Sequence, residues 1–377
     1  MPNRHLLLSL SLSAVMLLGC EQEPAAPPPD SRATAATDDG ALQASTLHAW
    51  QRFLPLARKS LDSLEQLNQQ AAELVRAPAA ETLAAARDSW HRVHRQLLSL
   101  APLFSLSAAN PELLQQLRSQ HFELDGWPIT PGYLDSFDVY VHSGIVNDIS
   151  IPINAEAIRA QHWLTDTEDI VLGLHAIAYL LWGENQQRSA ADFTPQTLSP
   201  IQEQNGLSAV DLPNQRRAAL LQLQITLLND DLSQLVYRLE QSASSLNSSY
   251  DSLAAPVQLE LWRGGLQQLL QRLQQRDLAK PEEPTEEWHY HNEFAGQTAA
   301  TLALELESVR QLLSEQATGQ QPLGYWLLAE GQSDSAVQQL DSAIALLRGY
   351  SDPWAQLPHE LAAQLQEQLQ TLRLLLH

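Results

Sequence analysis

Hydrophobic residues repeat with the period of an α-helix along most of this chain after residue 47. In residues 54–75, apolar side chains recur at intervals of three and four, which places them on one face of a helix. Residues 220–239, 261–273 and 298–313 show the same spacing and are rich in residues that favour helices. Pro and Gly separate these long segments by short links, as in antiparallel bundles. The pattern predicts an all-α protein.

One segment, Trp127–Ile153, breaks this pattern. It is rich in Pro, Gly, Tyr, Asp and β-branched residues and has no helical period. Segments of this kind are uncommon inside helical proteins and often serve a function. We expect an ordered irregular loop that lies beside the helix predicted after it. A weaker break at Thr194–Pro213 divides the rest of the chain near its middle.

The N-terminus has the features of a lipoprotein signal peptide, which we assign to residues 1–19. Arg4 precedes an apolar run, Leu6–Leu18, of about 13 residues, whereas a membrane-spanning helix needs roughly 20. The run ends in Leu-Leu-Gly followed by Cys20, the single cysteine of the chain. We predict that Cys20 is the lipidated first residue of the mature protein, which anchors the protein to a membrane.

Residues 20–44 follow the signal peptide and are rich in Pro, Ala, Asp and Ser. Because this composition cannot form a core, we expect a disordered tether, and we assign the folded domain to residues 45–377. Glu21 and Gln22 follow Cys20, without the Asp that usually retains a lipoprotein in the inner membrane. We therefore expect the protein at the periplasmic face of the outer membrane rather than at the inner membrane.

The chain is strongly acidic, with 44 Asp and Glu against 22 Lys and Arg and a net charge of −22. This charge argues against a nucleic-acid partner. It fits either an affinity for cations or simple solubility.

The segment Glu168–Gly183 is predicted to be a helix that carries one histidine. Helical spacing puts these residues on one face: Glu168, Leu172, His175, Ala178, Tyr179 and Trp182. The stretch Gly-Leu-His-Ala-Ile-Ala that ends at Ala178 resembles the GxHxxE signature of the imelysin-like family, with Ala178 in place of the Glu. The Tyr-Leu-Leu-Trp-Gly that follows continues the likeness.

Residues on both sides extend the resemblance over the chain from about Leu47. They are Trp90, Gly126-Trp127-Pro128, Tyr133, Asp135, Gly144–Asp148, Arg216-Arg217 and Asp230-Asp231. The resemblance implies an imelysin-like fold of two antiparallel helical-bundle halves packed together, at about residues 45–200 and 205–377. It also implies a periplasmic or outer-membrane lipoprotein associated with iron uptake, in a family that carries a historical peptidase label.

The family places its motif in the cleft between the halves, so His175 is the leading candidate for a metal ligand. The other candidates for cleft or ligand-binding residues are Trp127, Tyr133, Asp138, Asn147, Asp148 and Glu168. Because Ala178 offers no carboxylate, the helix supplies one ligand instead of two. We expect iron or another divalent metal to bind weakly at His175, and the identity of any cofactor stays unknown.

Two other places hold side chains of the type that bind metals. His91 and His94 are one helical turn apart, and Glu286–Glu293 contains His289 and His291. Neither place holds a complete set of ligands by itself. We interpret both as structural and keep a metal site as the alternative.

Catalytic motifs are absent from the sequence. It contains neither HExxH nor HxxEH, since Tyr179 follows Ala178, and it lacks a Gly-x-Ser-x-Gly motif. We predict no catalytic residue and a non-catalytic binding or accessory component of iron or metal acquisition, with metal-uptake proteins as partners. The alternatives are a metallopeptidase of the imelysin family and a binder of a polysaccharide or protein ligand in the cleft.

Overall fold

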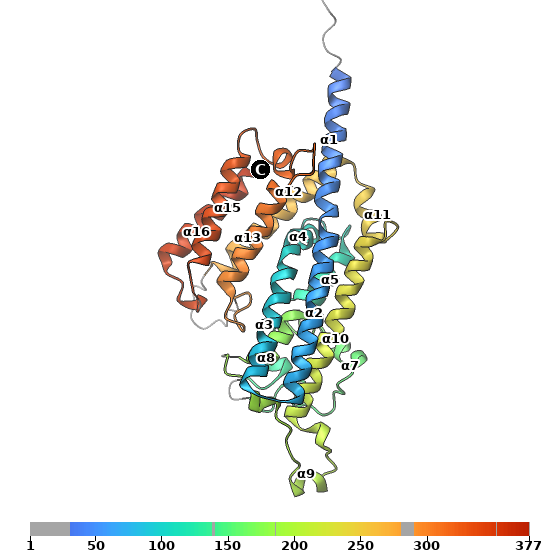
Figure 1. The fold of residues 1–377 in the computed structure, drawn as a ribbon, viewed down its shortest axis with the longest axis vertical. Coiled ribbons are helices and arrows are strands. Elements are labelled where there is room, and N and C mark those ends of the chain that lie inside the picture. The colour runs from blue at the N-terminus through green and yellow to red at the C-terminus, as the bar shows by residue number, and fades with distance from the viewer. Residues whose placement is uncertain (1–30, 138–139, 185, 280–289, 352, 377) are drawn as a thin grey trace, which may run out of the picture.

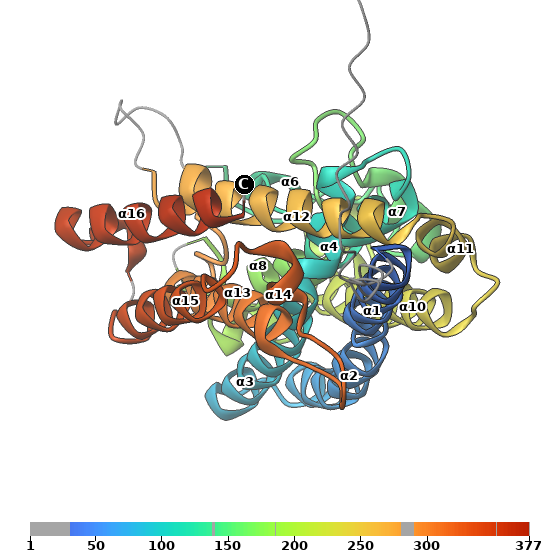
Figure 2. The same cartoon turned by 90° about the horizontal axis from the view of Figure 1, so that it is seen from above.

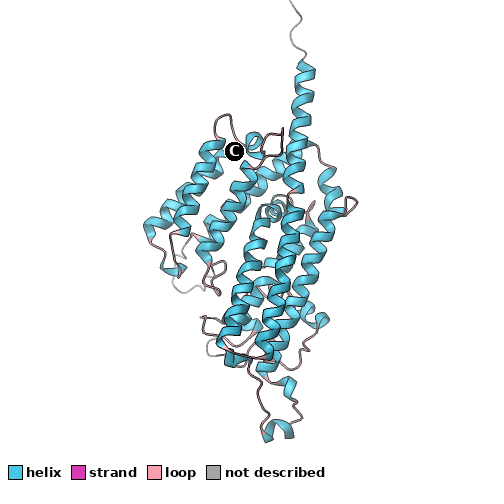
Figure 3. Ribbon diagram, viewed as in Figure 1, coloured by secondary structure: helices cyan, strands magenta, loops and turns pink. Residues whose placement is uncertain are grey.

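The computed structural model describes residues 31–137, 140–184, 186–279, 290–351 and 353–376. Figure 3 shows helices throughout this part of the chain. The β-type pairing in the described residues is one isolated bridge, between Phe137 and Tyr140. The predicted all-α class is confirmed.

The α-helices, in chain order, are α1 (Ser31–Gln51), α2 (Phe53–Arg76), α3 (Ala80–Leu97), α4 (Ala101–Ala109), α5 (Gln115–Asp125), α6 (Pro131–Leu134), α7 (Ala155–Gln161), α8 (Gly173–Trp182), α9 (Pro200–Gln204), α10 (Pro213–Glu240), α11 (Ser245–Asp251), α12 (Ala255–Arg272), α13 (Thr298–Ser314), α14 (Leu323–Leu327), α15 (Ser333–Arg348) and α16 (His359–Leu375). The shorter turns are the 3₁₀ helices η1 (Leu98–Leu100), η2 (Ala190–Phe193), η3 (Ala209–Asp211) and η5 (Trp354–Gln356) and the π-helical turn η4 (Leu273–Asp277).

The long helices form two groups that lie side by side (Figure 1). In the first group, α2 packs on α3 and α10, and α8 packs on α3, α5 and α10. In the second group, α13 packs on α15, and α16 packs on α15 and α12. Figure 2 shows α12 and α16 along one side of the molecule, and α2 and α3 along the other. Helix α4 connects the groups because it packs on α12 and α13 as well as on α5.

These two groups do not coincide with the predicted ranges of 45–200 and 205–377. Helix α10 follows residue 205 but packs in the first group, and α4 precedes residue 200 but packs on α12. The reason is that apolar faces decide the packing. The face of α10 that includes Leu220, Leu228 and Leu235 is fully buried, so this helix needs neighbours along its length.

Helix α1 begins inside the range predicted to be a disordered tether. Residues 31–44 are helical, and Ala, a strong helix former, recurs in this stretch. Hydrogen bonds attach the C-terminal part of α1 to the rest of the protein. The Ser45 hydroxyl donates to Gln321 O at 2.8 Å, and the Thr46 hydroxyl donates to Gln258 Oε1 at 2.7 Å. The predicted signal peptide and Cys20 lie outside the described residues. Among the described helices, none combines the length and apolar character needed to cross a membrane.

The segment Trp127–Ile153 is an ordered loop, as predicted. In its described part it contains α6, a short turn of helix, and the isolated bridge. The Arg216 guanidinium donates to Ile145 O, Val146 O, Asp148 O and Ile151 O at 2.7–2.9 Å, which fixes the far end of the loop to α10. The Tyr179 hydroxyl donates to Ser136 O at 3.0 Å, so the loop lies beside α8.

Helix α8 is buried along its whole length, which explains why its sequence is apolar on every side. It begins at Gly173, whose φ of +86° belongs to the left-handed region. A Cβ at this position would lie 2.7 Å from Leu124 O. Glycine therefore lets the start of α8 touch the end of α5, and this contact positions the site described next.

Candidate metal centre

Four buried residues from distant parts of the chain converge beside the N-terminus of α8. They are His94, Asp125, His175 and His291, and each offers a ligand atom that lies within 4.8 Å of the other three. His94 comes from the last turn of α3, Asp125 ends α5, and His175 is in the first turn of α8. His291 lies in the turn that precedes α13. We call this set the tetrad.

The tetrad is closely packed. His175 Nε2 lies 3.0 Å from Asp125 Oδ1 and 2.9 Å from His291 Nε2. The Asp125 carboxylate also lies 3.6 Å from His94 Nε2 and 3.9 Å from His291 Nε2. Asp125 and His175 are thus at the centre of the group, with the other two imidazoles on either side.

Surrounding side chains fix the imidazole rings. Trp90 stacks on His94 with ring centroids 4.7 Å apart, and Trp127 meets His175 edge-on at 4.8 Å. The Asn292 side-chain amide lies 3.5 Å from His94 Nδ1 and donates to the Thr301 hydroxyl. The backbone N–H of His291 donates to Asp277 Oδ1 at 3.0 Å. Rings that are held in this way keep their donor atoms pointing at a common place.

The electrostatics of the tetrad favour the protonation states that bind metal ions. Burial raises the pKa of Asp125, but the adjacent imidazoles, His175 first, outweigh burial and hold this pKa well below its usual value. Burial lowers the pKa of His94 to about 3 and also holds the pKa of His291 well below its usual value. At neutral pH the centre therefore presents an ionised carboxylate and neutral imidazoles at these positions.

Two observations show that the tetrad fits a metal ion. First, His94 Nε2 and Asp125 Oδ1 are buried and lack a hydrogen bond of good geometry within the described structure, a costly state that a cation would relieve. Second, ligands at about 2.0–2.2 Å from one ion lie at most about 4.4 Å apart. The observed limit of 4.8 Å needs only small side-chain movements to meet this requirement.

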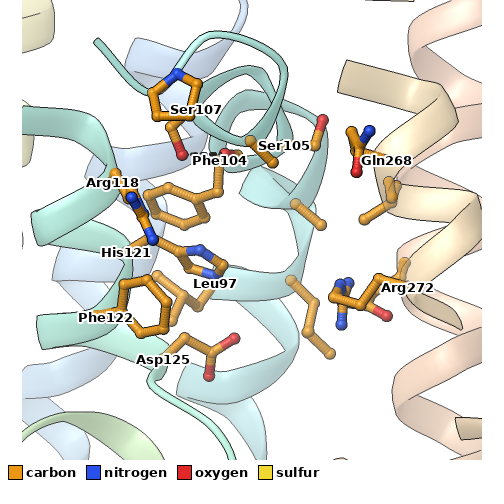
Figure 4. Close-up of a pocket in the computed structure, with 16 residues that line it drawn as sticks. Leu97, Phe104, Ser105, Ser107, Arg118, His121, Phe122, Asp125, Gln268 and Arg272 are labelled. Carbon is orange, nitrogen blue, oxygen red and sulfur yellow. Dashed lines mark hydrogen bonds and ion pairs between the residues drawn. The ribbon is translucent and has the colours of Figure 1, made fainter. Parts of the chain in front are cut away.

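A cavity of about 410 Å³ opens on Asp125 from the side of the second helix group. Figure 4 shows Asp125 at one end, His121 and Arg118 from α5 along one wall, and Gln268 and Arg272 from α12 along the other. Asp125 thus belongs to both the tetrad and the cavity wall.

The structure places the sequence-predicted site residues in different surroundings. His175 is in the tetrad and Trp127 packs against it. The Tyr133 hydroxyl donates to Gln161, the Asn147 amide donates to Ser143 O, and Asp148 accepts from Ser150, so these three bond to other partners than the tetrad. Asp138 lies outside the described residues.

The spacing had predicted that Glu168 and His175 lie on one helix, but they do not. Glu168 is exposed and precedes Gly173, where α8 begins. The predicted helix extended too far toward the N-terminus. The chain before Gly173 is extended, and α8 begins only at the positive φ of this glycine. Glu168 instead supplies a backbone carbonyl that accepts from Thr130 N at 3.0 Å.

The carboxylate missing at Ala178 is supplied by Asp125, which the sequence analysis did not identify. His175 therefore has a carboxylate neighbour that its own helix does not supply. His94 and His291 were interpreted as structural, and both belong to the tetrad. The available signal was the Asp directly before Gly126-Trp127-Pro128, a stretch already linked to the motif helix by the family resemblance.

Comparisons with known proteins agree with this architecture. One solved structure with a similar fold is an imelysin-like protein from Psychrobacter arcticum 273-4, with a TM-score of 0.55 and 14% identity, which covers 89% of this chain and 93% of that one. Another is described as a "putative iron-regulated protein A precursor" from Parabacteroides distasonis ATCC 8503, with a TM-score of 0.52, 13% identity and coverage of 94% and 97%. No curated protein matches the chain.

A family model also matches most of the sequence. The Peptidase M75 model, described as imelysin, covers residues 53–374, which include every member of the tetrad. The chain belongs to the imelysin family.

Proposed function

We propose that this protein is a lipid-anchored, non-catalytic component of iron or other transition-metal acquisition that binds its ion at the tetrad. The observation that carries the proposal is the convergence of three imidazoles and one carboxylate, all buried, within 4.8 Å of one another. Buried groups of this kind are costly unless they are paired or bind a metal ion. Cys20 at the end of the apolar N-terminal run supports the lipid anchor and a position at the periplasmic face of the outer membrane.

The chemistry of the donors narrows the choice of ion. Imidazole nitrogen suits iron, zinc, copper and nickel, whereas calcium and magnesium prefer sites made of oxygen atoms. The tetrad offers three nitrogen ligands and one carboxylate. The similar fold of a protein described as iron-regulated supports iron among these metals.

A metal-dependent hydrolase is the second candidate, because one carboxylate in the cavity has the properties of a general base. Burial raises the pKa of Glu305 even though Arg272 acts against this effect, and Glu305 lines the same cavity as Asp125. Loss of peptide hydrolysis in Glu305→Gln, with metal binding retained, would favour this candidate. The absence of hydrolysis by the metal-loaded wild type favours the binding role.

Metal titration tests the main proposal. The chain from residue 20, with Cys20→Ser to keep it soluble, is titrated with Co²⁺ and anaerobically with Fe²⁺, with heat and the visible Co²⁺ bands as readouts. We expect one equivalent to bind and His175→Ala to weaken binding at least 100-fold. His142→Ala is the matched control, because His142 is exposed and does not belong to the tetrad. Equal affinities for the two variants would overturn the proposal.

A further inference from the structure

The cavity beside the tetrad has the size and lining of a site for a small organic molecule. Its volume of about 410 Å³ is within the range of ligand pockets, roughly 300–1,000 Å³. Its walls come from both helix groups, with α4 and α5 on one side and α12 and α13 on the other. It is therefore a site that exists only when the two groups are packed together.

Much of the wall is apolar. Leu97, Leu98, Ala101, Phe104 and Leu269 line the cavity. These side chains favour a ligand with an apolar body, because binding then removes the apolar surfaces of the ligand and of the cavity wall from water. The Phe104 ring stacks on the His121 ring with centroids 4.6 Å apart, which gives the cavity a flat aromatic wall.

Polar side chains make up most of the rest of the lining, and the cation at the rim favours an anionic group in the ligand. Arg118 is exposed at the rim and has no ion pair among the described residues. Deeper in the cavity, Arg272 is paired with Glu305 at 2.5 Å, so that this pair is neutral as a whole. His121 makes no hydrogen bond in the described structure, and burial lowers its pKa to about 4, so at neutral pH it offers one donor and one acceptor without charge.

A metal ion bound at the tetrad would strengthen the preference of the cavity for an anionic ligand. This step rests on the proposed function. A divalent ion held by three neutral imidazoles and the Asp125 carboxylate leaves one positive charge at the inner end of the cavity. Arg118 adds a second positive charge at the rim. A neutral or cationic ligand would leave both charges uncompensated in a partly apolar site.

We infer that this cavity binds a small organic chelator, with an apolar or aromatic body held between α4 and α12 and an anionic oxygen-donor group directed past Asp125 to the ion. The protein would then bind the ion and an organic ligand together, with His121 and Arg118 as groups that recognise the ligand. The substrate class is thus a metal complex of an organic acid, hydroxamate or phenolate type rather than the free ion alone.

Three related probes separate the two parts of the proposed ligand. Benzohydroxamate carries an aromatic body and a chelating group, acetohydroxamate carries the chelating group alone, and benzamide carries the body alone. Each is titrated calorimetrically into the Co²⁺-loaded protein, and the visible Co²⁺ bands report whether the ligand reaches the ion. We expect benzohydroxamate to bind at least 10-fold more tightly than either of the others and to shift these bands.

Variants test the position of the ligand. Ala108 lines the cavity and is exposed, so Ala108→Phe should narrow the site without disturbing the core. Ala191→Phe is the matched control, since Ala191 is also exposed and lies on η2, away from the cavity. Ala108→Phe and Arg118→Gln should each weaken benzohydroxamate at least 10-fold, whereas Co²⁺ alone should bind all variants as it binds the wild type.

The two readouts distinguish failure of this inference from failure of the proposed function. If Co²⁺ alone does not bind the wild type, the proposed function is wrong. If Co²⁺ binds but benzohydroxamate is no tighter than acetohydroxamate, is insensitive to Ala108→Phe and Arg118→Gln, or removes Co²⁺ from the protein, the organic ligand site is wrong.

Discussion

His175 Nε2 lies 3.0 Å from Asp125 Oδ1, although the two residues belong to different helices. This contact gives the family's histidine a carboxylate neighbour that its own helix does not provide. It depends on Gly173, whose missing side chain lets α8 start against the last turn of α5.

Replacing Asp125 should remove most of the metal affinity. Asp125→Asn keeps the size of the side chain but removes the charge that balances a bound cation, so we expect binding to weaken on the order of 100-fold or more. Calorimetric titration with Co²⁺ measures the change. Asp148→Asn is the control, because Asp148 is an exposed loop carboxylate. Similar affinities for the two variants would show that Asp125 is not a ligand.

Replacing Gly173 should destabilise the fold and displace His175. Gly173→Ala places a Cβ 2.7 Å from Leu124 O at a φ of +86°. A strained backbone of this kind costs about 1–3 kcal/mol, and the steric conflict adds to that cost. Thermal unfolding measures the loss of stability, and Co²⁺ titration the loss of affinity.

A second glycine separates backbone strain from steric conflict. Gly206 has a similar φ of +80°, but a Cβ there would meet nothing within 4 Å. Gly206→Ala should therefore lower the free energy of unfolding by the strain alone and leave metal affinity unchanged. If Gly173→Ala is no worse than Gly206→Ala, the close approach of α8 to α5 does not matter.

The sequence predicted the fold better than the site, and the reason is physical. Helical period is a local property, so the long helices and the irregular segment Trp127–Ile153 could be recognised from neighbouring residues. His175 was found because it lies in a local signature. Asp125 does not lie in such a signature. Its place directly before Gly126-Trp127-Pro128 was the available signal, and this position does not show which side chains Asp125 contacts.

The convergence of the tetrad depends on tertiary packing. His94 and His291 were visible as ligand-type residues, but no spacing in the sequence connects α3 with the turn before α13. Only the packing of α3, α5 and α8, and the ring contacts between His94, His175 and His291, bring the tetrad together. The same limit applies to the grouping of the helices, because the packing of α10 on α2 is a long-range contact.

The lipid anchor can be tested without reference to the metal. If Cys20 is the lipidated residue, Cys20→Ser should abolish metabolic labelling with a fatty acid and release the protein from membranes. Immunoblotting of membrane and soluble fractions measures the second effect. Ser31→Ala, at the start of α1, is a control that should leave labelling unchanged. Labelling that persists in Cys20→Ser would exclude the assignment.

Acidification should destabilise the metal-free protein, and His162 should contribute to this effect. Burial first, and then Arg159, lowers the pKa of His162 to about 4, whereas an unfolded histidine has a pKa near 6.5. Between these values the unfolded chain binds a proton that the folded protein does not, so the free energy of unfolding falls as the pH falls. The contribution is on the order of 2 kcal/mol across this window.

The comparison of His162→Phe with the wild type isolates this contribution. His162 Nδ1 accepts from Val171 N at 3.4 Å, so the variant should lose some stability at every pH. Its loss between pH 7 and pH 4.5 should nevertheless be smaller than that of the wild type. Chemical denaturation at both pH values measures the difference, with His142→Phe as an exposed control. The same pH dependence in all three proteins would contradict the prediction.

Restoring the family's Glu at position 178 should lower the stability of the fold and should not raise the metal affinity. Ala178 is fully buried, so Ala178→Glu must fit a larger side chain and a carboxylate into a packed helix, at a cost of several kcal/mol. Asp125 already provides the carboxylate beside His175, so we expect no gain in Co²⁺ affinity. Ala178→Gln separates size from charge: it should be destabilised less than Ala178→Glu in thermal unfolding. A Glu variant that is as stable as the wild type and binds Co²⁺ more than 10-fold tighter would show that the site accepts both carboxylates, and that Asp125 does not replace the motif residue.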